Sequence, residues 1–335
     1  MTAPKPRALT GELPSGLAGA TAGAVGALRG RAPAGSAAGG VGWTRVGEKG
    51  SRLGIWFVVW FCRVFGRAFT RLLLRPVVLY FVALAPVARR ASRDYLRRMG
   101  QPHRFRDVYA HCLRFAHTTL DRMFFVLGRA DLFRVTRTGS HHLTELMRQG
   151  RGALLFGAHV GSFEAMLGVA EHNAVPLNIV GYFKNARLLN DVLQKLNPNA
   201  HARLITVEPG IDFVLRLKER IDAGELVALL ADRVGLGERA VEVDLLGGRV
   251  SLPVGPYLLA SILRCPIYLT FGLFHEPNRY DLYCEPFAER VELPRTDRER
   301  AARDYVERYA QRLEHFCRLA PDNWFNFYDY WRLEA

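Results

Sequence analysis

Apolar and polar positions along the second half of the chain follow two alternating periods. Short apolar runs typical of buried strands are separated by segments whose apolar residues recur every three or four positions, as in helices. The expected strands are 153–156, 177–180, 203–207, 226–230, 241–246, 266–273 and 280–284, and the expected helices are 162–173, 186–196, 211–223, 253–263 and 297–319. This alternation predicts an α/β fold with a mixed, mostly parallel sheet flanked by helices.

The apolar residues near the N-terminus have a different pattern. The runs 53–62 and 76–88 contain no charged residue, but neither reaches the roughly 18–20 apolar residues that span a bilayer. Between them an arginine recurs at every fourth position from Arg63 to Arg75, which on a helix forms a basic stripe opposite the apolar side chains. This pattern favours a membrane-associated helical segment in the bilayer interface. A pair of buried helices and a single span are the alternatives.

Charge is concentrated in the same region of the chain. The net charge is +14, and residues 1–110 carry all of it, with 18 basic and 4 acidic residues, whereas 111–335 carry 28 of each. Because the expected folded part is neutral, a nucleic-acid-binding domain is not expected. Basic residues beside apolar sequence instead indicate an anionic membrane surface or an acidic carrier protein.

Composition divides the chain into three parts. Residues 1–50 are rich in Ala, Gly and Pro, so they predict a disordered tail. Residues 51–100 are expected to form the basic amphipathic anchor, and residues 101–335 are expected to form the folded domain. The five cysteines have no paired spacing and no histidine at zinc spacing, which argues against a disulfide framework or a structural zinc site and favours buried thiols in a reducing compartment.

The octapeptide from Gly157 to Glu164 is the strongest candidate for chemistry. It predicts a strand that ends near His159, a turn at Gly161 and a helix whose first turn carries Glu164. At such a corner the imidazole and the carboxylate can meet near the positive end of the helix, which gives a general base with an orienting acid. The octapeptide also fits a structural loop histidine, but its position at the carboxyl end of a strand favours catalysis.

Three further clusters are candidates for substrate binding. They are Lys184, Asn185 and Arg187 after the second strand, Asp232 and Arg233 after the 226–230 strand, and Gly247 with Gly248 at a turn. The first offers two cations and an amide to an anionic substrate, although a solvated loop has the same composition. The acid–base pair fits an ion pair as well as an active site. The glycines permit a tight turn and are chemically silent.

Motifs of several other enzyme classes are absent from the sequence. It contains no GxSxG elbow of an α/β-hydrolase, no complete dinucleotide-binding fingerprint and no phosphate-binding Walker A loop. An Asp-x-Asp-like metal pair at a strand end, expected of a glycosyltransferase, is also missing.

Together these segments resemble the late lipid A acyltransferase family, which is related to lysophospholipid acyltransferases. The resemblance covers residues 50–333 and rests on the order of its parts: the basic anchor, His159-x4-Glu164, Lys184–Arg187, Asp232 after a strand, Gly247-Gly248 with Pro253, and 321–328. The sequence departs from the family at Lys184, at Arg233 and at Asp322-Asn323. Its N-terminal part resembles a subgroup associated with aryl-polyene or other glycolipid gene clusters.

The resemblance implies an O-acyltransferase. Such an enzyme moves a fatty acyl chain from an acyl carrier protein thioester to a hydroxyl of a membrane lipid or glycolipid, lipid A or a relative. His159 would be the base, Glu164 would orient it, and backbone N–H groups near Gly161 and Ser162 would offer an oxyanion site. Lys184, Asn185, Arg187, Asp232, Arg233, Gly247 and Gly248 would line the substrate site.

The resemblance also implies the surroundings of the enzyme. No cofactor is expected beyond the carrier thioester, which is a co-substrate. The expected partners are an acyl carrier protein, the lipid acceptor and an anionic membrane surface, with no nucleic acid. The expected location is the cytoplasmic face of the inner membrane, as a peripheral, monotopic or single-pass protein. The alternative is a catalytically inactive lipid-binding protein of the same fold.

Overall fold

The computed structural model describes residues 52–163, 165, 176–181, 202–235 and 238–331. The predicted tail therefore lies outside the described residues, as do the predicted helix 186–196 and most of the predicted helix 162–173.

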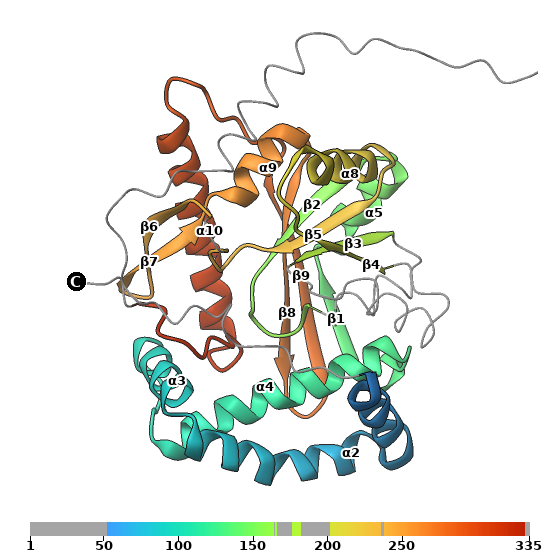
Figure 1. Cartoon of the computed structure of the whole chain (residues 1–335), viewed down its shortest axis with the longest axis vertical. Coiled ribbons are helices and arrows are strands. Elements are labelled where there is room, and N and C mark those ends of the chain that lie inside the picture. Colours follow the sequence, from blue (N-terminus) through green and yellow to red (C-terminus); the bar gives the residue numbers. More distant parts are fainter. Residues whose placement is uncertain (1–51, 164, 166–175, 182–201, 236–237, 332–335) are drawn as a thin grey trace, which may run out of the picture.

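A seven-stranded sheet forms the centre of the molecule (Figure 1). Its strands are β1 (Arg134–Thr138), β2 (Ala153–Gly157), β3 (Leu177–Gly181), β4 (Ala202–Thr206), β5 (Leu226–Leu230), β8 (Ile267–His275) and β9 (Arg279–Ala288), in the order β1-β9-β8-β2-β5-β3-β4. Every neighbouring pair is parallel except the hairpin β8–β9. The predicted mixed, mostly parallel sheet is confirmed.

Two strands were missing from the sequence prediction. β1 has no apolar run because it is an edge strand, and four of its five residues are exposed. The second is β7 (Gly248–Pro253), which forms a separate antiparallel hairpin with β6 (Ala240–Leu245). The prediction that Pro253 opens a helix is wrong, because Pro253 is paired with Ala240 at the end of β7.

The helices of the second half lie against the sheet and the hairpin. They are α5 (Ser140–Arg148), α8 (Ile211–Asp222), α9 (Gly255–Leu263) and α10 (Arg298–Leu319), with a short 3-10 turn at Ala130–Leu132. In α8 the buried residues Phe213, Val214, Leu217 and Ile221 recur at helical spacing and join the same core as the strands. The five cysteines are free, and four of them are buried.

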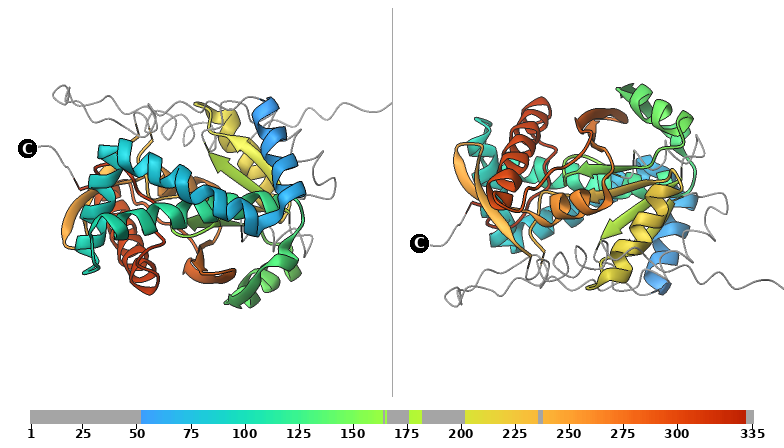
Figure 2. Two further views of the ribbon diagram at one scale, coloured as in Figure 1. Left: turned by 90° about the horizontal axis from the view of Figure 1, so that it is seen from below. Right: turned by 90° about the horizontal axis from the view of Figure 1, so that it is seen from above.

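Three N-terminal helices pack at one end of the sheet: α2 (Arg52–Leu84), α3 (Pro86–Arg98) and α4 (Phe105–Val126). α2 and α4 lie side by side (Figures 1 and 2). α2 is kinked at Gly66, which has φ 69°. Among the described helices, none is by itself long and apolar enough to cross a bilayer, whereas the bent pair Val64–Leu84 and Pro86–Arg98, at 96°, meets the requirement by length and composition.

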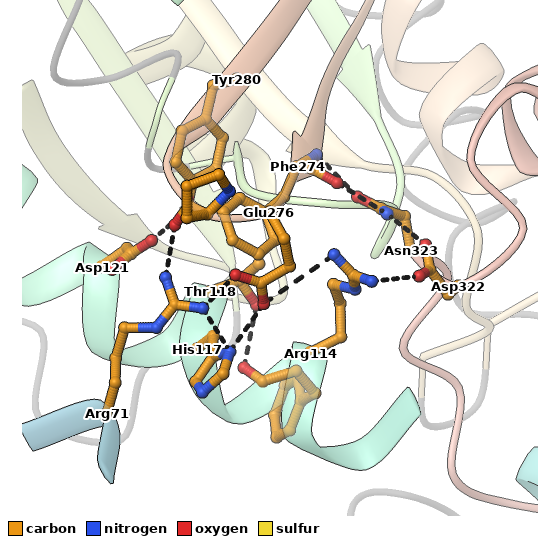
Figure 3. Close-up of polar contacts among 12 residues, drawn as sticks. Arg71, Arg114, His117, Thr118, Asp121, Phe274, Glu276, Tyr280, Asp322 and Asn323 are labelled. Carbon is orange, nitrogen blue, oxygen red and sulfur yellow. Dashed lines mark hydrogen bonds and ion pairs between the residues drawn. The ribbon is translucent and has the colours of Figure 1, made fainter. Parts of the chain in front are cut away.

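Two arginines of the α2 stripe, Arg67 and Arg71, face the protein. Arg67 forms a bidentate ion pair with Asp121 of α4, at 2.7 and 2.9 Å, and this fully buried carboxylate also accepts the hydroxyl of Tyr280. Arg71 is paired with Glu276 at the β8–β9 turn, and the same carboxylate contacts His117 (Figure 3). Burial alone raises the pKa of Glu276, but hydrogen bonds from His117 and Arg71 outweigh it and lower that pKa to about 2.

His111 of α4 links these helices to the C-terminal segment, which is residues 320–331. Its Nδ1 lies 2.8 Å from the hydroxyl of Ser92 in α3, and its Nε2 lies 3.1 Å from the carbonyl oxygen of Trp324. The carbonyl can only accept, so Nε2 carries the proton and Nδ1 accepts from Ser92. Burial, with a smaller contribution from Arg114, lowers the pKa of His111 to about 4.

We expect His111 to make the fold sensitive to acid. The pKa is lower in the folded state than in the unfolded chain, so the unfolded state binds the proton first as the pH falls below about 6.5. Stability then falls until about pH 4, by roughly 3 kcal/mol in total. Urea unfolding at pH 7 and pH 4.5 should show a smaller loss in His111→Gln than in the wild type. The exposed His103→Gln variant is the control, and an equal loss in all three proteins would contradict this assignment.

Candidate active site

The register of two neighbouring strands brings His159 and Asp232 together. β2 and β5 are parallel, and Gly157 is paired with Leu230. His159 and Asp232 each lie two residues beyond that pair, at the carboxyl edge of the sheet. The ring Nδ1 of His159 lies 2.8 Å from Oδ1 of Asp232, and the backbone N–H of His159 donates to Oδ2 at 3.0 Å.

The carboxylate of Asp232 is fully buried and receives three N–H groups. The third donor is the indole Nε1 of Trp324, 3.1 Å from Oδ2. Burial alone raises the pKa of Asp232, but the charge and hydrogen bonds of His159, with the charge of Arg233, outweigh it and hold the pKa below its usual value. An ionised carboxylate only accepts, so Nδ1 of His159 carries the ring proton and Nε2 is left as the basic atom.

The C-terminal segment is hydrogen-bonded to the loop that carries His159. The N–H of Gly161 donates to the carbonyl of Asn323 at 2.7 Å, and the N–H of Phe325 donates to the carbonyl of His159 at 3.0 Å. The side chain of Asn323 binds both backbone groups of Phe274, at 2.7 and 3.0 Å (Figure 3). The loop that carries His159 is therefore held by the chain end and, through Asn323, by the end of β8.

Gly161 is required at the turn after His159. Its φ is 67°, and a Cβ atom there would lie 1.9 Å from the carbonyl oxygen of Gly272. Ser162 follows, and its hydroxyl accepts the N–H of Ala165, an N-cap contact that starts the helical turn. The prediction of a strand, a glycine turn and a helix start is confirmed over these described residues.

The backbone N–H groups of Gly161 and Ser162 do not form the expected oxyanion site. That of Gly161 donates to Asn323, and that of Ser162 donates to the carbonyl of Gly272 at 2.7 Å. Because both hydrogen atoms are used inside the fold, neither is available to a developing oxyanion. This expectation is wrong because the loop is clamped between the C-terminal segment and β8.

Arg233 supports the same segment. Its guanidinium donates to the carbonyl of Phe325 at 3.0 Å and lies 5.5 Å from the ring centre of Tyr328. The buried Nε of Arg233 has no hydrogen-bond partner among the described residues. A contact between Arg233 and a substrate phosphate stays a prediction.

The remaining predicted site residues are placed as follows. Glu164, Lys184, Asn185 and Arg187 lie outside the described residues, so their roles stay predictions. Gly247, with φ 71°, forms the two-residue turn of β6–β7 together with Leu246. A Cβ on Gly248 would meet Arg98 and Trp331 within 2.5–2.7 Å, so this glycine lets α3 and the chain end approach the hairpin.

Two aromatic residues near Asp232 were not predicted as part of the site. Trp324 binds the carboxylate, and the hydroxyl of Tyr330 donates to the backbone carbonyl of Asp232. The aromatic density of 324–331 is a visible signal, since a buried Trp or Tyr needs a polar partner. The sequence does not show which partner that is.

Residues 129–333 match the family model described as bacterial lipid A biosynthesis acyltransferase. No curated protein gave a match. The matched region begins after α4 and contains His159, Asp232 and Trp324.

We expect Asp232→Asn to reverse the tautomer of His159. Oδ2 accepts two N–H groups and Oδ1 accepts one, so the amide oxygen should take the Oδ2 position. The amide NH2 then faces Nδ1 and donates to it, which moves the ring proton to Nε2. The ¹⁵N chemical shifts of the labelled imidazole would report this change.

The control for this experiment is Asp244→Asn, whose side chain is 79% exposed in the β6–β7 hairpin. It should keep the wild-type spectrum of His159. An unchanged tautomer in Asp232→Asn would show that Asp232 does not determine the protonated nitrogen.

Proposed function

Because the chain belongs to the family of bacterial lipid A biosynthesis acyltransferases, we propose that it transfers a fatty acyl chain from an acyl carrier protein thioester to a hydroxyl of a membrane lipid or glycolipid. The family supports an acyltransferase of lipid biosynthesis, while the carrier donor and the acceptor belong to the proposal. The observation that carries the catalytic part is the 2.8 Å contact between His159 and a buried carboxylate.

In the proposed reaction, Nε2 of His159 removes the proton of the acceptor hydroxyl. The hydroxyl oxygen attacks the thioester carbonyl, and a new C–O bond forms as the C–S bond breaks. The proton then passes from Nε2 to the leaving thiolate of the carrier, so the histidine returns to its starting state. Asp232 stabilises the imidazolium that exists in between, as in a Ser-His-Asp triad.

In this proposal Asp232 orients the imidazole of His159 at Nδ1. The sequence analysis assigned that function to Glu164. Glu164 stays a predicted catalytic residue on the first helical turn after His159. Lys184, Asn185 and Arg187 stay predicted contacts to phosphate groups of the acceptor or of the carrier arm. No cofactor other than the carrier thioester is proposed.

We also propose that the enzyme works on the cytoplasmic face of the inner membrane. Of the 17 large apolar side chains that are exposed in the described part of the chain, 12 lie between Trp60 and Val87. The opposite face of α2 is held in the protein by the ion pairs of Arg67 and Arg71. A helix whose Arg67 and Arg71 are paired with acids of the protein, and whose Phe, Leu and Val side chains are exposed, suits a bilayer better than water.

We expect His159→Ala to lower acyl transfer by about 10²–10⁴-fold, the usual contribution of a general base. The assay supplies an acyl carrier protein thioester and a bacterial lipid extract, and mass spectrometry detects the acylated product. Folding and vesicle binding should be unchanged. His315→Ala, an exposed histidine on α10, is the matched control.

Two further variants separate the predicted acids in this assay. Asp232→Asn should approach the loss seen with His159→Ala, because the wrong tautomer leaves no basic Nε2, whereas Glu164→Gln tests the partner assigned from sequence. Near-normal transfer by His159→Ala would overturn the mechanism. A wild-type protein that binds lipid and transfers nothing would instead support the inactive lipid-binding alternative.

We expect negative charges introduced by substitution on the exposed face of α2 to weaken membrane binding. Leu72 and Leu84 are 54% and 63% exposed, and each contributes about 1.5–3 kcal/mol if it enters the bilayer. Leu72→Glu/Leu84→Glu should therefore bind vesicles at least about 100-fold more weakly in co-sedimentation. Leu215→Glu/Leu319→Glu changes two residues of similar exposure elsewhere, 48% and 47%, and should bind normally. Equal binding by both double variants would refute the proposed face.

A further inference from the structure

A cavity of about 280 Å³ lies between α3 and the C-terminal segment. Its walls are formed by Arg90, Ala91, Asp94, Arg97 and Arg98 of α3 and by Tyr328, Asp329, Tyr330 and Trp331. Three guanidinium groups, two carboxylates, two phenols and an indole therefore meet around a space large enough for a small polar group. The mechanism above does not use this cavity.

The arginines of α3 have different tasks. Arg89 donates to the carbonyls of Val82 and Ala83 and so caps the C-terminal end of α2. Arg93 donates to the carbonyl of His103. These two residues do not line the cavity.

The three arginines that line the cavity are held to different degrees. Arg98 lies 4.5 Å from the ring centre of Trp331 and binds Asp94, so it is fixed in the cavity wall. Arg97 also binds Asp94. The three arginines exceed the two lining carboxylates, Asp94 and Asp329, by one, so the cavity lining has a net positive charge.

The cavity adjoins the exposed apolar face of the N-terminal helices. Leu84, at the end of α2, is 63% exposed, and Val87, in the first turn of α3, is 42% exposed. Arg90 and Asp94 follow Val87 at spacings of three and seven, so they continue the same stripe of the helix. If the apolar stripe lies in the bilayer, the next turns of α3 lie at the depth of the phosphate groups.

The lining suits a phosphate group rather than a neutral ligand. Arginines present paired N–H donors that match phosphate oxygens. Asp94 already accepts from Arg97 and Arg98, so it orders these guanidinium groups. We propose that this cavity binds the phosphate group of an anionic bilayer lipid. The proposal rests on the proposed membrane location and not on the acyl-transfer mechanism.

A bound lipid phosphate would be close to the catalytic residues. Tyr328, in the cavity wall, contacts Arg233, and Tyr330 donates to the backbone of Asp232. One layer of aromatic side chains thus separates the cavity from the His159–Asp232 pair. Lipid binding there would hold this layer, and with it the chain end, against the bilayer.

The experiment compares two vesicle compositions that have the same surface potential. Phosphatidylcholine vesicles contain either phosphatidic acid, which presents a phosphate, or cholesteryl hemisuccinate, which presents a carboxylate. The full chain, Arg90→Gln/Arg97→Gln and Arg93→Gln/Arg106→Gln are tested on both. The last variant removes the same charge outside the cavity, at an arginine of α3 and at Arg106 of α4, which is 77% exposed.

We expect the wild type to bind the phosphatidic acid vesicles about tenfold more tightly, as one charge-assisted hydrogen bond would give. Arg90→Gln/Arg97→Gln should lose this preference. Arg93→Gln/Arg106→Gln should keep it, even if its overall affinity falls. No preference in the wild type, an intact preference in the cavity variant, or an equal loss in both variants would overturn the proposal.

A calorimetric titration with inorganic phosphate identifies the source of the ligand. Phosphate binding to the wild type without any vesicle preference would mean that the cavity takes a soluble anion, and the lipid assignment would fail. Neither experiment uses an acyl donor. The preference can therefore hold while acyl transfer fails, or fail while acyl transfer holds.

Discussion

The buried carboxylate of Asp232 is the interaction on which the site depends. An ionised carboxylate without water must be satisfied by the protein, because leaving it unpaired costs several kcal/mol. Its three N–H donors come from His159 and Trp324. These groups belong to the loop after β2 and to the chain end, while Asp232 follows β5. One charge therefore joins three parts of the chain and determines the basic nitrogen of His159.

A second set of ion pairs connects this site to the N-terminal helices. Arg67 is paired with Asp121, and Arg71 with Glu276, so α2 is attached to α4 and to the β8–β9 turn. Just before that turn, Phe274 at the end of β8 is bound through its backbone by the side chain of Asn323 (Figure 3). Asn323 is followed in the chain by Trp324. The direction of the exposed apolar face is thus set relative to the loop that carries His159 by polar contacts, which tolerate less rotation than apolar packing does.

Much of the fold could be predicted because its signals are local. The buried strands β2, β3 and β5 are short apolar runs, and the predicted 226–230 strand coincides with β5. β1 and β7 were missed because an exposed edge strand and a half-exposed hairpin strand have no such run. The arginine stripe of α2 was also visible, but periodicity specifies only that two faces differ. Packing against Asp121 and Glu276 decided which face turned inward.

The sequence by itself determined the family, the position of His159 at a strand end, and the glycine that turns the chain after it. The family resemblance rests on the order of motifs over residues 50–333. The strand end and the turn follow from hydrophobic pattern and backbone sterics close to His159. Only the tertiary structure decided that Asp232, 73 residues away, binds the imidazole, and that Trp324 completes the site. The physical reason is strand order. β5 lies beside β2 although β3 and β4 intervene in the chain, and that pairing depends on how all the strands pack together.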